Sequence, residues 1–133
     1  MKNLEQIRAA AALAYANTKV KKTGLEGGEV VKKLPALIMS NGLLAAGAFA
    51  FAKGDEEGWS LCFDHLAQHL AHPDVAIVPV TANKLRSLLD HLSNDADSAT
   101  LKWATEEALA WLSYARRFVR KPTDHGGPND PRL

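Results

Sequence analysis

Residues 34–52 read LPALIMSNGLLAAGAFAFA and carry no charged side chain, whereas Lys33 and Lys53 flank them. A run of 19 uncharged residues is long enough to raise the question of a membrane span. Pro, Ser, Asn and Gly interrupt the run, and most of its apolar content is alanine, whose transfer into lipid gains little. We therefore expect no membrane span, but a helix that starts near Pro35 and is apolar on nearly every side because other helices surround it.

The composition of this central helix predicts how its neighbours pack. Small side chains let other helices approach closely, and larger ones fill the spaces left between them. One polar residue, Asn41, needs a hydrogen-bonding partner in such surroundings. The small residues are Gly42, Ala45, Ala46, Gly47 and Ala48, and the larger ones are Leu37, Leu44, Phe49 and Phe51.

The whole chain has a composition that favours helices. Its 133 residues fit one compact domain. Alanine occurs 22 times and leucine 18 times, whereas Val, Ile and Thr together number 16. Cys62 is the only cysteine, which excludes an internal disulfide framework and makes a reducing, intracellular setting the default. Residues 1–6 are too polar for the hydrophobic run of an export signal.

Helical spacing predicts further helices on both sides of the central one. The first is capped by Asn3 with Gln6 and stops at Gly24. After a loop and a short helix within 24–34, the central helix follows. Two sets of apolar residues at 3–4 spacing then mark two more helices, one that ends before Pro73 and one that is capped by Thr81. The first set is Trp59, Cys62, Phe63, Leu66 and Leu70, and the second is Leu85, Leu88, Leu89 and Leu92.

Two segments complete this organisation. Residues 74–80 are β-branched but contain a proline and find no partner strand, so we expect an extended connector. The last helix follows the polar turn 93–98, and its core face carries Leu101, Ala104, Thr105, Ala108, Leu112 and Ala115, with Trp103, Trp111, Tyr114 and Phe118 alongside. In the first helix the expected buried seam is Leu4, Ile7, Ala11, Ala14 and Thr18. The prediction is an all-α, single compact bundle of five or six helices in residues 1–121, around the central apolar helix, with a flexible tail at 122–133.

Charge is distributed unevenly along the chain. Residues 1–53 carry eight basic and three acidic side chains, residues 54–107 carry three and ten, and residues 108–133 carry five and two. Because both basic blocks lie near chain ends, they can meet in a folded bundle and form a positive surface that suits a polyanion. The alternative is that basic residues near helix C-termini only complement the helix dipole.

Basic residues alternate with tyrosines on the first and last helices. Basic side chains attract the phosphates of a nucleic acid, and aromatic rings stack on its bases. The arginine guanidinium can also hold one phosphate through two hydrogen bonds. The alternative is a solvated helix face with tyrosines packed at its edge. The candidate RNA-binding residues are Arg8, Tyr15, Lys19, Lys22, Arg116, Arg117, Arg120 and Lys121.

Evidence for catalysis is weaker. His65, His69 and His72 have the spacing of one helix face and could present imidazoles to a metal ion, but partly exposed structural histidines are the simpler interpretation. Cys62 lies on an apolar face, where a thiol acts as a small hydrophobe. Glu106 and Glu107 diverge by about 100° on a helix, so we expect them to balance the arginines that follow. No phosphate-binding loop or nucleophile elbow is present, and we expect neither a cofactor nor a metal.

Three segments, in this order, resemble the small helical subunit of type III-B CRISPR RNA-guided effector complexes, the fifth subunit of the Cmr complex. They are RAAAALAYA at 8–16, KLPALIMSNGLLAAGAFAFAK at 33–53 and TEEALAWLSYARRF at 105–118. The resemblance covers about 3–53 and 98–120. Residues 54–97 agree with the family in helix content only.

The resemblance implies a cytoplasmic subunit without catalytic activity that acts in antiviral defence. Its partners are then the backbone subunits, further copies of itself stacked into a minor filament, and the guide and target RNA, with no membrane involved. The positions that match its RNA-holding basic residues are Arg8, Lys19, Lys22, Arg116, Arg117 and Arg120. Two alternatives stay open at this point, the small subunit of the type III-A complex and a metal-dependent enzyme that uses the three histidines.

Overall fold

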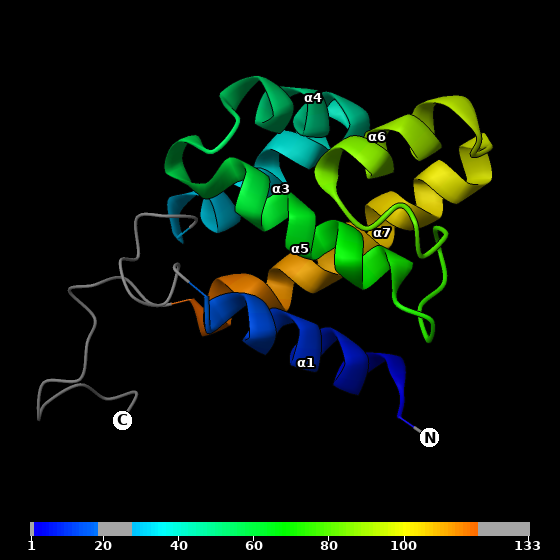
Figure 1. Ribbon diagram of the computed structural model, residues 1–133. Helices are drawn as coiled ribbons and strands as arrows, with labels where there is room; N and C mark the ends of the chain where they lie inside the picture. Colours follow the sequence, from blue (N-terminus) through cyan, green and yellow to red (C-terminus); the bar gives the residue numbers. More distant parts are fainter. Residues whose placement is uncertain (1, 19–27, 120–133) are drawn as a thin grey trace, which may run out of the picture.

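The computed structural model describes residues 2–18 and 28–119 of the chain (Figure 1). This part contains six α-helices, one 3-10 helix and no strand, which confirms the all-α prediction. The elements are α1 (Leu4–Ala16), α3 (Gly28–Asn41), α4 (Leu43–Lys53), η1 (Glu56–Gly58), α5 (Trp59–Ala71), α6 (Leu85–Asn94) and α7 (Ser98–Phe118). The predicted tail at 122–133 lies outside the described residues.

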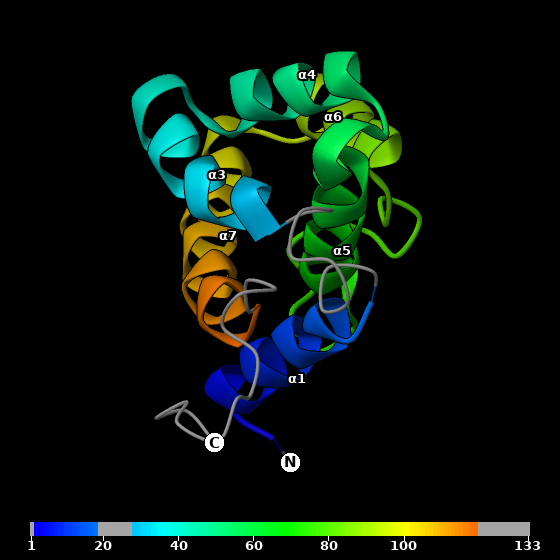
Figure 2. The same cartoon turned by 90° about the vertical axis from the view of Figure 1, so that its left-hand side faces the viewer.

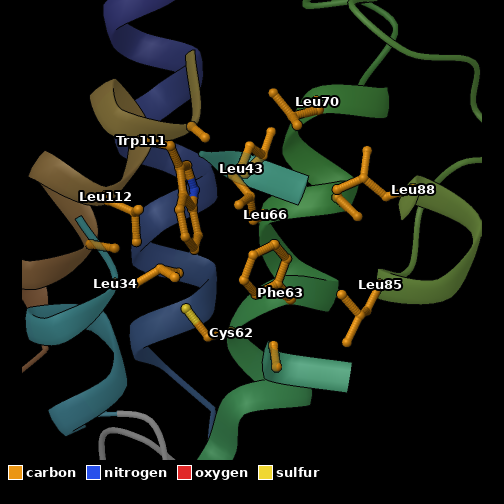
Figure 3. Packing of buried hydrophobic residues seen from close by; sticks show 14 of the residues in the cluster. Leu34, Leu43, Cys62, Phe63, Leu66, Leu70, Leu85, Leu88, Trp111 and Leu112 are labelled. Atoms are coloured by element: carbon orange, nitrogen blue, oxygen red, sulfur yellow. The ribbon is translucent and has the colours of Figure 1, made fainter. Parts of the chain in front are cut away.

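Helix α5 occupies the middle of the bundle. It packs against α1, α3, α4, α6 and α7, and α4 and α6 lie at one end of the molecule while α1 lies at the other (Figure 2). The predicted apolar face is confirmed, because its five residues from Trp59 to Leu70 are all buried. Figure 3 shows this face between Leu34 of α3 and Trp111 of α7 on one side and Leu85 and Leu88 of α6 on the other.

The uncharged run 34–52 forms parts of two helices, so the prediction of one continuous central helix is wrong. The chain turns at Gly42, whose φ of 91° and ψ of 161° lie where an L side chain is strained. Helix α3 also starts earlier than predicted, at Gly28, because Val30, Val31 and Leu34 bury one side of it. Pro35 consequently lies inside α3 and not in its first turn.

Helix α4 covers the core from outside and is not enclosed by other helices. Leu43, Ala46 and Ala50 are buried, but Phe49 and Phe51 are 43% and 54% exposed. Asn41 is also exposed, so it does not need the internal partner that was predicted for it. No helix within 2–18 and 28–119 has both the length and the apolar character needed to cross a bilayer.

Helix α1 is capped as predicted, but it is shorter than predicted and buries a different face from the one that was expected. The Gln6 N–H donates to Asn3 Oδ1 at 2.9 Å, and the Asn3 N–H donates to Gln6 Oε1 at 2.9 Å. The helix ends at Ala16, whereas a run to Gly24 was expected, and the predicted stop lies outside the described residues.

The buried residues of α1 are Ile7, Ala12, Tyr15 and Ala16. Leu4 and Ala14 of the expected seam are exposed, so the seam is wrong at these positions. The face that packs is the one with Arg8 and Tyr15.

The start of α6 is set by a residue from another helix. Thr81 is exposed and does not cap it; α6 begins at Leu85, whose N–H donates to Asp64 Oδ1 of α5 at 2.8 Å. Residues 74–80 contain no helix or strand, as predicted, but the segment is not extended, because it turns at Val75 and Ala76, whose N–H groups donate to the His72 carbonyl at 2.9 and 2.7 Å. It is held by the N–H groups of Ile77 and Val78, which donate to the Leu70 carbonyl at 3.1 and 3.2 Å.

Close packing of α4 on α6 requires a glycine at position 47. A Cβ atom there would collide with the Leu89 side chain. We expect Gly47→Leu to lower the free energy of unfolding by about 1–3 kcal/mol through overpacking. Ala48→Leu, one residue away on the exposed side of α4, is the matched control and should stay within about 0.5 kcal/mol of the wild type. Urea denaturation of the three proteins measures the difference, and equal stabilities would contradict the close approach of α4 and α6.

Candidate nucleic-acid interface

Two adjacent arginines, Arg116 and Arg117, lie exposed in the last turn of α7. Helix α7 is 21 residues long and starts at an Asp97 cap that accepts from the Thr100 N–H at 2.8 Å. The C-terminal end of a helix carries partial negative charge, which favours cations there. Within residues 2–18 and 28–119, no acidic side chain forms a salt bridge with either arginine. Within this part of the chain, both guanidinium groups are therefore exposed and without an acidic partner.

The two arginines border a half-open hollow of about 550 Å³ between α7 and α3. Pro35 and Met39 line it from α3, and Leu109 and Ser113 line it from α7. Met39 is 76% exposed. The surface thus combines two anion-binding forks with apolar contacts and a hydroxyl, a combination suited to a sugar–phosphate chain.

Helices α1 and α7 run in the same direction, and their C-terminal ends lie at the same end of the molecule (Figure 1). The order of contacts agrees, since Arg8 meets Glu107 and, further along, the Tyr15 ring meets the Trp111 ring. The start of α3 is also close, because Gly28 packs against Val119, with the Val119 Cγ1 atom 3.6 Å from the place of a Cβ on Gly28.

Four of the predicted basic residues, Lys19, Lys22, Arg120 and Lys121, lie outside the described residues. The chain connects to them at Thr18, Gly28 and Val119, all at the end of the bundle that carries Arg116 and Arg117.

Tyr15 is not on the surface, so the prediction that its ring stacks on a base is wrong. Its side chain is 0% exposed and packs between the rings of His65 and Trp111, with centroids 5.3 and 5.5 Å away. Burial and the hydrogen-bonded Cys62 thiol raise the pKa of the Tyr15 hydroxyl. Tyr15 is a core residue that joins α1 to α5 and α7.

Arg8 is held within the protein by a two-pronged ion pair. Its Nε and Nη2 atoms donate to Glu107 Oε2 and Oε1, both at 2.7 Å. The Arg8 side chain is 25% exposed, and that of Glu107 is 3% exposed. The Nε–Nη2 edge of the Arg8 guanidinium is occupied by Glu107, so this edge is not free to hold a phosphate as the prediction for Arg8 supposed.

His69 completes this internal network. Its Nε2 atom lies 2.9 Å from Glu107 Oε2, and its side chain is fully buried. The three residues thereby connect α1, α5 and α7. Two predictions fail here: Glu107 does not serve to balance the arginines at the end of α7, and His69 is not a partly exposed histidine. His65 is half-buried and His72 exposed, as predicted.

A signal for this network was present in the helical spacing. Glu107 belongs to the same 3–4 series as Ala104, Ala108 and Trp111, and His69 belongs to the series of Cys62 and Leu66. An ionisable residue on an apolar face needs a partner that faces it.

The network sets the charge state of Glu107. Burial on its own raises the pKa of a carboxyl group, but the hydrogen bonds from Arg8 and His69 outweigh this effect and lower the pKa of Glu107 to about 2. Glu107 is therefore ionised at neutral pH. Since its negative charge is matched by Arg8, it contributes no free negative charge to the surface.

Two groups that were weighed for catalysis are also accounted for. Burial raises the pKa of the Cys62 thiol to about 12, although the hydrogen bond with Tyr15 lowers it, so little thiolate exists at neutral pH. Among the described residues, no group of three or more His, Cys, Asp or Glu side chains could hold a metal ion. His65, His69 and His72 thus do not form the metal site that their spacing allowed.

The described residues form an all-helical body, in agreement with the small helical subunit that the sequence resembles. The profile of the family described as CRISPR-associated protein (Cas_Cmr5) matches residues 4–121. The chain belongs to this family, the small subunit of type III-B CRISPR effector complexes. Comparison with curated proteins and with solved structures found no match.

Glu107 and its exposed neighbour Glu106 offer a matched test of the network. We expect Glu107→Gln to lower the free energy of unfolding by about 3 kcal/mol, since it leaves the Arg8 charge without its partner. Glu106→Gln removes the same charge from the solvent-exposed side of α7 and should change stability by less than about 0.5 kcal/mol. Chemical denaturation measures both, and a similar small effect of the two variants would contradict a structural role of the pair.

The same network predicts a dependence of stability on pH. The pKa of Glu107 is below its ordinary value of 4.5 in the folded protein, so its contribution is present above pH 4.5 and is lost as the pH falls towards 2. The difference in melting temperature between the wild type and Glu107→Gln should therefore shrink between pH 5 and pH 2. A difference that stays constant over this range would show that Glu107 is not ionised in the folded state.

Proposed function

We propose that this chain is a non-catalytic small subunit of the type III-B complex that contacts the guide and target RNA in antiviral defence in the cytoplasm. Several copies stack into a minor filament beside the backbone subunits. The observation that carries the RNA contact is the pair Arg116–Arg117, exposed and without an acidic partner in 2–18 and 28–119.

Arginine suits this contact for geometric reasons. A guanidinium fork can donate two parallel hydrogen bonds to one phosphate, and two adjacent forks can hold neighbouring phosphates of one strand. Phosphate contacts are independent of sequence, as a subunit that serves every guide requires. Two such contacts give weak binding to one copy, and a row of copies on one RNA gains affinity by repetition.

The exposed apolar side chains support contacts with protein neighbours. Met39, Phe51, Val80 and Trp103 are each more than half exposed. Large apolar groups on the surface favour protein–protein contact. Head-to-tail stacking uses two different surfaces of each copy, so the contact need not close into a ring.

A catalytic role has little support in the chemistry of the described residues. The Cys62 thiol is buried, the Glu107 carboxylate is paired, and the three histidines of α5 and its C-cap do not converge. The type III-A alternative is not supported by the family match, which is to the Cmr subunit.

The arginine pair can be tested within the assembled complex. We expect Arg116→Glu with Arg117→Glu to weaken RNA retention and to make its logarithmic dependence on salt less steep by about 1.5, for two lost phosphate contacts. Lys84→Glu with Lys102→Glu makes the same charge change at two exposed lysines elsewhere and should have little effect. Filter binding at several salt concentrations measures retention.

Two results would contradict the proposal. One is unchanged retention at low salt by the arginine variant, where phosphate contacts count most. The other is hydrolysis of RNA by the purified wild-type chain with a normal turnover.

A further inference from the structure

A second hollow, on the other side of α3, has a different chemical character from the arginine surface. It has a volume of about 480 Å³ and is bounded by α3, α4, η1 and the start of α5. Its lining residues are Lys33, Ala36, Leu37, Ser40, Asn41, Phe49, Lys53, Glu57 and Trp59. We propose that this hollow binds one nucleoside monophosphate unit, either free or as part of single-stranded RNA.

The hollow is produced by two sharp changes of chain direction. Gly42 turns α4 back over α3, and the segment 54–58 turns the chain again into α5. Gly54, Glu57 and Gly58 all have positive φ angles, and Glu57 is held at 55° although it is not glycine. Such strained positions are kept where surrounding structure enforces them and often border functional sites. The volume is within the range of small-molecule sites.

The charge of the hollow favours a single anionic group. Lys33 and Lys53 line it from α3 and from the last turn of α4, and Glu57 is the only acidic residue in its lining. Neither lysine forms a salt bridge with a described acidic residue. Two positive charges and one negative charge leave a net charge of +1, which matches one phosphodiester.

An aromatic wall lies beside these charges. Phe49 is 43% exposed, and its ring meets the Trp59 ring edge to face with centroids 4.9 Å apart. Lys53 Nζ lies 5.6 Å from the centre of the Phe49 ring. A planar base gains by stacking on such a ring, while the ammonium group stays within reach of a phosphate.

One buried donor of this wall is unsatisfied. Trp59 is 4% exposed, and its Nε1–H has no hydrogen-bond partner among the described residues. Buried donors of this kind are normally paired, and an oxygen of a bound nucleotide would satisfy this one. Ser40 and Asn41 add a hydroxyl and an amide to the lining. A nucleotide supplies both the oxygen acceptors and the flat surface that these groups require.

This proposal adds a site to the proposed function and can fail independently of it. The two hollows use different residues of α3. This hollow is lined by Lys33, Ala36, Leu37, Ser40 and Asn41, whereas the arginine surface is lined by Pro35 and Met39. Loss of RNA retention in the Arg116 and Arg117 variant tests the arginine surface alone. Nucleotide binding to the isolated full chain, observed at Trp59, tests this hollow without the rest of the complex.

The three tryptophans make a direct readout possible. Each indole N–H gives its own signal in a two-dimensional nitrogen–proton NMR spectrum, and Trp59→Phe assigns the signal of the pocket. Titration with uridine and adenosine 5′-monophosphate, up to about 10 mM, should shift the Trp59 signal, while Trp103 and Trp111 serve as internal controls. Inorganic phosphate and a short oligouridylate are titrated in parallel.

Charge variants test the lysines. Lys33→Glu with Lys53→Glu should weaken nucleotide binding by about tenfold or more, and Lys33→Gln with Lys53→Gln by less. Lys84→Glu with Lys102→Glu makes the same charge change at two exposed lysines outside the hollow, and this matched control should leave the dissociation constant unchanged. Circular dichroism checks that each variant is folded.

The outcomes separate the possible sources of the ligand. Shifts of Trp59 by the free nucleotides and by the oligomer support a nucleotide site, and shifts by the oligomer alone identify RNA as the source. Inorganic phosphate that binds as tightly as the nucleotides would overturn the role of the base. A Trp59 signal that no probe moves would falsify the proposal, as would an equal response to a glutamate-rich peptide, which points to an acidic protein partner.

Discussion

The contact between Arg8 and Glu107 joins two residues that are 99 positions apart in the sequence, and much of the architecture depends on it. The buried residues of α1 are Ile7, Ala12, Tyr15 and Ala16, and the Tyr15 ring packs between His65 of α5 and Trp111 of α7. A two-pronged ion pair has one good geometry, so together with this packing it fixes the position and rotation of α1. We interpret the pair as a source of structural specificity more than of net stability, because burying charges is costly. With Arg8 directed inwards, Tyr15 follows it into the core, and the C-terminal ends of α1 and α7 lie together.

The elements that could be predicted were those where local pattern and final packing agree. The apolar face of α5 and the capping box of α1 follow from spacing and capping chemistry, and the structure contains both. The predicted core face of α7 is confirmed at Ala104, Ala108, Leu112 and Ala115, whereas Leu101 and Thr105 are only partly buried. The break at Gly42 could not be predicted in the same way, since the residues before and after it are equally apolar and a single glycine is tolerated in many helices. The start of α6 was missed because the carboxylate that accepts from its first N–H belongs to Asp64, which lies on another helix 21 residues before Leu85.

The candidate RNA-binding residues fall into two groups, those that are exposed and those that have partners inside the protein. Arg116 and Arg117 are exposed as the pattern suggested, whereas Arg8 and Tyr15 have their partners inside the protein. Composition alone cannot distinguish an arginine that faces solvent from one that faces a buried glutamate. The position of Glu107 on the core face of α7 was the available sign that one basic residue had to be directed inwards.

The burial of Cys62 has a practical consequence for work with this protein. The chain has one thiol, and that thiol lies on the central helix with 0% of its surface exposed. A maleimide or disulfide reagent can reach it only when α5 separates from its neighbours, so the rate of labelling reports how often the bundle opens. The native chain can therefore serve as its own sensor of core opening, with no engineered label, both alone and after assembly with its partners.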